Sequence, residues 1–165
     1  MDKCHFRGGI LKSPVLKNIL AAVLGYVVMF AVSFPLFGLL WSVLGADGAF
    51  AAGSWNVSCE WIIGSIVLGG LVSIAGGFSC SWAAVSRGGV AILVGLVLAF
   101  GILALVPDAG VAPGLRPDQV SMFDAMTSAQ QPLGMLWLNP VLGVIGVLFG
   151  AMLQGGKPPL RQIAD

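Results

Sequence analysis

The stretch WIIGSIVLGGLVSIAGGFSCSWAAV, residues 61–85, decides the fold class of this chain because it is long, apolar and free of charge. A helix needs about 20 apolar residues to cross the hydrocarbon core of a bilayer. Small residues recur at every fourth position along it: Ser65, Gly69, Ser73, Gly77 and Ser81. This spacing places them on one helix face, where a second backbone can approach closely. The segment therefore predicts a membrane-spanning helix with a smooth packing face.

Three further apolar blocks accompany this segment, at residues 19–45, 90–106 and 133–153. In hydrocarbon, every backbone N–H and C=O group needs an internal partner, which only helices and closed barrels provide. The strands of membrane barrels are about 9–11 residues long and alternate in polarity, unlike these blocks. We therefore expect an all-α bundle of four transmembrane helices over residues 19–153. A basic tail at residues 1–18 and a short tail at residues 154–165 would flank it.

The composition of the whole chain excludes an ordinary soluble domain. Hydrophobic residues make up 58% of the 165 residues and charged residues 9%, whereas soluble domains carry about 25% charged residues. The mean hydropathy of +0.98 agrees with this assignment. The formal net charge is only +1, so nothing favours a nucleic-acid partner, and membrane lipid is the expected surrounding.

The basic residues predict the orientation of the four spans. Seven of the eight would lie on one side: Lys3, Arg7, Lys12, Lys17, Arg87, Lys157 and Arg161. The eighth, Arg116, would lie on the other side. The positive-inside rule then places both termini in the cytoplasm, as in a multi-pass protein of the cell inner membrane. Four tryptophans at the predicted outer ends would occupy the interfacial layer: Trp41, Trp55, Trp61 and Trp137.

A cleavable secretory signal is the alternative interpretation of the N-terminal part. Basic residues, an apolar run and the sequence Ala49-Phe50-Ala51 follow one another as in such a signal. However, the apolar core of a signal is about 7–15 residues long, and residues 19–45 are nearly twice that. We therefore favour an uncleaved first span; cleavage would leave three spans and an external N-terminus.

Small residues also recur along the third and fourth spans. Ala91, Gly95 and Ala99 recur at every fourth position of the third span, and Gly146 and Gly150 have the same spacing in the fourth. Such stripes can form tight contacts within one bundle. Alternatively, they can form a dimerisation face or line a narrow substrate path. Small-xxx-small patterns are general in membrane helices, which favours packing within the bundle. If Gly69 and Gly77 both pack, replacing either with leucine would disrupt assembly.

The predicted second outer loop, residues 107–132, holds a candidate short helix at residues 117–130. Pro117 suits the first position of a helix. Val120, Phe123 and Met126 would then share an apolar face. We expect this short amphipathic helix to cap the bundle, although the same face could lie on the membrane surface.

Reactive side chains are few and scattered. His5 is the lone histidine, and Cys4, Cys59 and Cys80 are not placed for a disulfide or a metal site. No nucleophile–base pair, phosphate loop or redox motif occurs, so we expect neither catalysis nor a metal or other cofactor. Three residues at the outer ends of spans form a candidate ligand or interhelical polar site: Glu60, Asn139 and Pro140.

Several stretches are similar to small uncharacterised four-helix bacterial inner-membrane proteins. They are ILAAVLGYVVMF at residues 19–30, the loop sequence GSW at 53–55, the glycine-rich end of the second span, and NPVLGVIGVLFGA at 139–151. The resemblance implies four helices and a bacterial membrane but no activity. The sequence therefore favours a non-catalytic accessory or self-associating component, in a homo-oligomer or a larger membrane complex. The alternative is a transporter or channel for a small neutral or lipidic molecule.

Overall fold

A computed structural model describes residues 13–105, 115–117 and 120–155 of the chain. Most of the basic residues used to predict the orientation lie outside these ranges, as do His5, Cys4 and the greater part of both tails. The described part is almost entirely helical, and its extended pairings are two isolated bridges, Phe50 with Val57 and Asn56 with Gln130. The expected all-α class is confirmed.

Five helices make up the described part of the chain. They are α1 (Pro14–Ala49), α2 (Cys59–Ala83), α3 (Gly88–Leu103), α4 (Met122–Ser128) and α5 (Leu133–Gln154). Three of them, α1, α2 and α5, are long and apolar enough to cross a membrane. Helix α3 is equally apolar but has only 16 residues, somewhat fewer than the span predicted at residues 90–106.

Helix α1 is longer than predicted at both of its ends. It begins at Pro14 instead of residue 19. Proline fits the first position of a helix, because an N–H group there would have no partner within the helix. Its other end passes residue 45 and stops at Ala49. Gly45 interrupts the helical backbone with φ 62° and ψ −174°, a conformation that is essentially restricted to glycine. Gly45 therefore changes the direction of the chain four residues before the helix ends.

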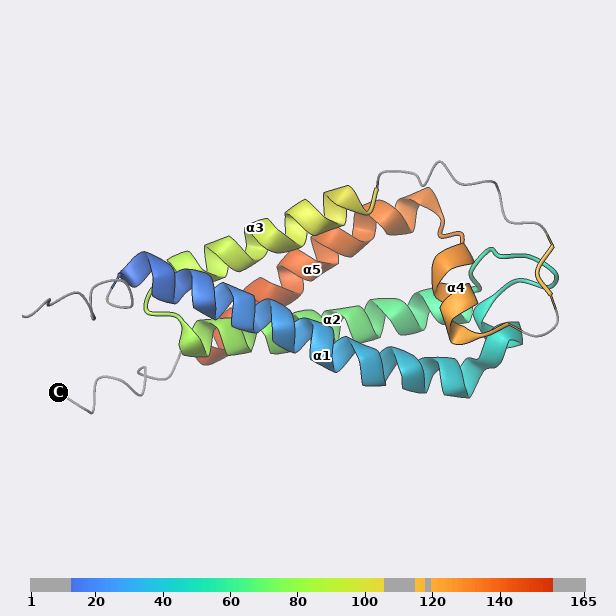
Figure 1. The fold of residues 1–165 in the computed structure, drawn as a ribbon, viewed down its shortest axis with the longest axis horizontal. Helices are drawn as coiled ribbons and strands as arrows, with labels where there is room; N and C mark the ends of the chain where they lie inside the picture. The colour runs from blue at the N-terminus through green and yellow to red at the C-terminus, as the bar shows by residue number, and fades with distance from the viewer. Residues whose placement is uncertain (1–12, 106–114, 118–119, 156–165) are drawn as a thin grey trace, which may run out of the picture.

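Helix α2 lies at the centre of the bundle and packs along both α1 and α5. Helix α3 contacts α1 and α5 from the other side, whereas α1 and α5 are not a packed pair. Figure 1 shows α1 beginning and α5 ending at one end of the bundle, which we call the base. Helix α4 and the α1–α2 loop lie at the opposite end, which we call the cap.

Close backbone contacts hold the base half of the bundle together. A Cβ atom on Gly77 would overlap the backbone of Val147, and one on Gly150 would overlap the carbonyl of Ile74. On the opposite face of α2, a Cβ on Gly25 would lie 2.8 Å from the Gly76 carbonyl oxygen. These glycines therefore let α1 and α5 approach α2 to a distance that no larger residue permits.

A buried asparagine ties the start of α1 to the α2–α3 connection. Asn18 is 8% exposed, and its Nδ2 donates to Ser86 Oγ at 2.8 Å. The backbone N–H of Ser86 donates in return to Asn18 Oδ1 at 3.3 Å. The sequence analysis placed Asn18 in a polar tail, so this contact was not anticipated.

The cap is a small second core built from loops and α4. Its buried members are Ala49, Phe50, Trp55 and Ala125. Backbone hydrogen bonds join its segments: Gln130 N–H donates to the Trp55 carbonyl at 2.8 Å, and Val57 N–H to the Gln130 carbonyl at 3.2 Å. The two loops, distant in sequence, therefore form one covering layer.

Helix α4 occupies part of the range predicted for the short helix but begins later. Ser121 caps it by accepting a hydrogen bond from the Asp124 N–H at 3.1 Å, so the first residue is Met122. The bundle-facing side also differs from the expected one. Ala125 is buried, whereas the side chain of Phe123 is 74% exposed. A serine cap with an acidic residue in the first turn outweighs the proline at 117 as a start signal.

Candidate functional site

A cavity of about 500 Å³ lies in the cap half of the bundle, between α1, α2 and α5 and beneath α4. This volume is within the range of about 300–1,000 Å³ that is typical of small-molecule sites. Helices α1 and α5, which do not pack together, lie on either side of the cavity, and no residue of α3 contributes to its lining. Met122 and Met126 of α4 contribute to its roof, where flexible thioether side chains adapt to different shapes.

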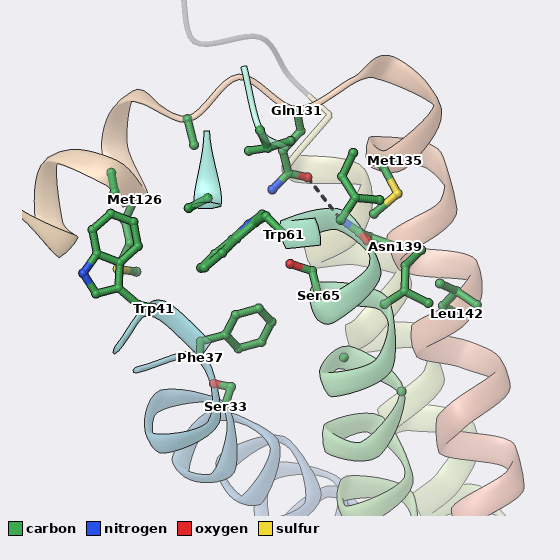
Figure 2. A pocket seen from close by; sticks show the side chains of 18 of the residues that line it. Ser33, Phe37, Trp41, Trp61, Ser65, Met126, Gln131, Met135, Asn139 and Leu142 are labelled. Atoms are coloured by element: carbon green, nitrogen blue, oxygen red, sulfur yellow. Dashed lines mark hydrogen bonds between the residues drawn. The ribbon is translucent and has the colours of Figure 1, made fainter. Parts of the chain in front are cut away.

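Aromatic side chains form the wall of the cavity on the α1 side. Four of them recur on one face of α1 with the spacing i, i+4, i+7 and i+11: Phe30, Phe34, Phe37 and Trp41. Trp61 of α2 meets Trp41 edge-on, with ring centroids 6.2 Å apart, and Phe37 at 6.2 Å in a tilted arrangement. Figure 2 shows these three rings together on one side of the cavity. The wall is therefore apolar, broad and rigid.

Polar side chains gather on the opposite wall, formed by α2 and the start of α5. Asn139 Nδ2 donates to Gln131 Oε1 at 3.4 Å, and both residues line the cavity. Ser65 of α2 lies beside them, as Figure 2 shows. Its Oγ atom is buried and has no hydrogen-bond partner among the described residues. Three uncharged hydrogen-bonding groups thus face the aromatic wall.

Ser65 differs from the other serines that line the cavity. Ser33 donates to the Phe30 carbonyl at 2.8 Å, and Ser73 donates to the Gly69 carbonyl at 2.8 Å. Such bonds to a preceding turn are the usual solution for a serine in a helix. The Ser65 hydroxyl lacks this bond, although burying a polar group without a partner costs roughly 1–3 kcal/mol. It is the one described lining hydroxyl left without an acceptor.

The three residues of the predicted polar site do not come together. Asn139 lines the cavity, as described above. Glu60 is exposed near the start of α2 and does not contribute to the lining. Pro140 is buried on the other side of α5, where a Cβ on Gly101 of α3 would lie 2.6 Å from its ring. The cavity therefore combines Asn139 with Ser65 and Gln131 instead.

The residues predicted to form packing faces divide into two groups. Gly77, Gly146 and Gly150 lie at close contacts between α2 and α5, and Ser73 is buried beside Gly146. A Cβ on Gly69 or on Gly95 would meet no atom within 4 Å. Gly69 and Ser65 line the cavity, Gly95 is exposed on α3, and Ser81 is half-buried at the base end of α2.

Three of the four outer tryptophans point inward instead of forming a belt toward lipid. Trp41 and Trp61 line the cavity, and Trp55 is buried in the cap, whereas Trp137 is 64% exposed. The sequence analysis treated them only as interfacial residues and did not identify Phe37 or Gln131 as site residues. The aromatic spacing along α1 is the sequence signal that predicts this wall.

An ion pair fastens the cap from its outer side. Arg116 Nη2 lies 2.7 Å from Asp47 Oδ1; the arginine side chain is 6% exposed and the aspartate side chain 95%. The guanidinium carbon also lies 6.0 Å from the centre of the Phe50 ring, which lines the cavity. Arg116 thus neutralises an exposed carboxylate while it packs on the aromatic part of the cap.

The described residues include no group of three His, Cys, Asp or Glu side chains that could hold a metal ion. In the same part of the chain, Cys59 and Cys80 are free thiols, exposed and buried respectively. No family model, curated protein or solved structure matches this chain. Evidence for its function comes from the geometry of the cavity.

Proposed function

We propose that this chain is a non-catalytic integral protein of the cell inner membrane that binds, and transfers between compartments or partners, a small neutral or lipidic molecule. The observation that carries the proposal is the cavity of about 500 Å³ with an aromatic wall, a polar wall and no charged lining residue among those described. Apolar sites with a few convergent polar groups are typical of ligand-binding pockets.

The proposed topology has four spans, α1, α2, α3 and α5, with the base in the cytoplasm and the cap outside. Lys17 and Arg87 at the base and Arg116 at the cap follow the positive-inside rule. Helix α3 spans about 24 Å over its 16 residues, which is less than the usual hydrocarbon thickness of about 30 Å. A short span is accommodated by local thinning of the bilayer.

A substitution that fills the cavity tests the proposed function. Because a Cβ on Gly69 meets no atom, Gly69→Phe would place a ring in the cavity without displacing backbone. Gly95→Phe is the matched control, since Gly95 is equally open but lies outside the cavity. Native mass spectrometry after gentle extraction should show a bound small molecule in the wild type. The fraction of protein that carries this molecule should be at least tenfold lower in Gly69→Phe. Equal occupancy in all three proteins contradicts the proposal.

A second candidate function is self-association, or docking as an accessory subunit of a larger complex. The observation that favours it is the small-residue face of α3. Ala91, Gly95 and Ala99 are all exposed there, away from the other helices. The same Gly95→Phe variant tests this candidate through its oligomeric mass. An unchanged mass for the assembly would remove α3 as the contact face.

A further inference from the structure

The polar wall of the cavity narrows the chemistry of the molecule that the site would hold. We propose that the ligand is a neutral, single-chain amphiphile whose hydrogen-bonding head contacts Asn139 and Gln131, with Ser65 as a third partner. Its apolar body would lie against the aromatic face of α1. This inference rests on the proposed function and adds the charge, the shape and the anchoring group of the ligand.

The absence of charge in the described lining argues for a neutral head. An ionised head brought into an apolar site needs an opposite charge or several hydrogen bonds to offset its desolvation. The described charges in the cap half are Glu60, Asp124 and the Arg116–Asp47 pair, and none of them lines the cavity. Three neutral groups that both donate and accept, a hydroxyl and two amides, suit an alcohol or carbonyl head.

The state of the polar groups argues that they are available to a ligand. The Asn139–Gln131 bond is long at 3.4 Å, and no second side-chain bond of either residue occurs among the described residues. Each amide therefore retains hydrogen-bonding capacity. Ser65 Oγ is unpartnered, and rotation about one bond changes its direction. Polar groups that lack a partner within the protein can form hydrogen bonds with a ligand.

The size and walls of the cavity argue for one chain rather than a large lipid. A volume of about 500 Å³ suits a drug-sized molecule. The aromatic wall runs along α1 from Trp41 to Phe30, about 16 Å at 1.5 Å per residue, which gives an extended chain a surface to follow. We expect such a chain to enter from the lipid between α1 and α5, because these two helices do not pack together.

Photo-crosslinking in proteoliposomes tests the inference with a hexadecan-1-ol that carries a diazirine on its chain. The label should map to cavity residues of the wild type and be displaced by unlabelled hexadecan-1-ol. Hexadecane should compete about fivefold less well, the effect of one lost hydrogen bond. Hexadecyl sulfate and hexadecyltrimethylammonium should compete at least tenfold less well. If either charged probe competes as well as hexadecan-1-ol, the assignment of a neutral head is wrong. Equal competition by the cationic probe would indicate that the head binds to the aromatic rings instead.

Two variants address the polar wall directly. Asn139→Leu should lower the labelling about fivefold. Ser65→Ala should lower it as well, and should raise the thermal stability of the ligand-free protein because it removes an unpartnered hydroxyl. Ser79→Ala is the matched control, since the Ser79 hydroxyl donates to the Ala75 carbonyl at 2.8 Å and lies outside the cavity. Unchanged labelling in both cavity variants contradicts the inference.

The outcomes separate the inference from the proposed function. If Gly69→Phe abolishes labelling but Asn139→Leu and Ser65→Ala do not, the cavity binds a lipidic molecule without using its polar wall. The proposed function then stands and the inference fails. If Gly69→Phe and Gly95→Phe are labelled to the same extent as the wild type, the probe does not occupy the cavity. The proposed function and the inference then both fail.

Discussion

The base half and the cap half of the bundle use the same helix face in opposite ways. Along α2, Gly77 lies against the backbone of α5, whereas Gly69, two turns away on the same face, borders open space. Small residues permit close approach of another helix, but the course of that helix decides whether the approach occurs. Where α5 follows α2, the stripe becomes an interface, and where α1 and α5 are apart it becomes the floor of a cavity.

The largest expected effect separates these two glycines. Gly77→Leu should destabilise the protein by more than about 3 kcal/mol, because its side chain would overlap the backbone of Val147. Gly69→Leu should leave the stability within about 1 kcal/mol of the wild type, since its side chain enters the cavity. Thermal melting of both variants in the same detergent measures the difference. Equal losses of stability would show that the two halves are packed alike.

An intermediate effect is expected at the turn that leads into the cap. Gly45→Ala should cost about 1–3 kcal/mol, because φ 62° and ψ −174° is strained for any residue with a Cβ. Gly38→Ala is the control, since Gly38 is helical, meets no neighbour and gains helix propensity. Urea or heat unfolding followed by tryptophan fluorescence reports on the cap, where Trp55 is buried. A Gly45→Ala protein as stable as Gly38→Ala would mean that the turn is not required.

The smallest expected effect concerns the polar contact at the base. Asn18→Ala should lose about 1 kcal/mol, the usual net value of a hydrogen bond, because the Ser86 hydroxyl and N–H lose their partner. A double-mutant cycle with Ser86→Ala should give a coupling of about 0.6 kcal/mol, the average for interhelical contacts in membranes. Strictly additive losses would show that the two side chains do not interact, and the base would then rely on its glycine contacts alone.

The helical class and the approximate helix positions were predictable because apolar length and backbone satisfaction leave few alternatives. The predicted span at residues 133–153 differs from α5 by one residue at its end. The bounds of α1 were less predictable. Pro14 and Asn18 read as tail residues, and the sequence does not show that Asn18 will find Ser86, 68 positions away. The start of α4 was not predicted correctly, because Ser121 caps the helix and the sequence analysis relied on Pro117 as its first residue.

The candidate site was only partly predictable. Asn139 stands out because an amide in an apolar helix needs a partner, and the structure places it on the cavity. Glu60 stood out as an ionisable residue at the membrane edge, but it does not line the cavity, and the sequence does not distinguish these two outcomes. Trp41 and Trp61 were interpreted as an interfacial belt. Only the positions of α2 and of the cap determine that both rings point inward.

The hydrogen-bonded cap has a consequence for how the cavity would fill. With α4 and the α1–α2 loop covering the cap end of the cavity, the proposed ligand would enter between α1 and α5, from the bilayer and not from water. Occupancy then depends on the mole fraction of the ligand in the membrane, and dilution of the aqueous phase leaves it nearly unchanged. A molecule too insoluble to be titrated in buffer would still equilibrate with this site within one leaflet.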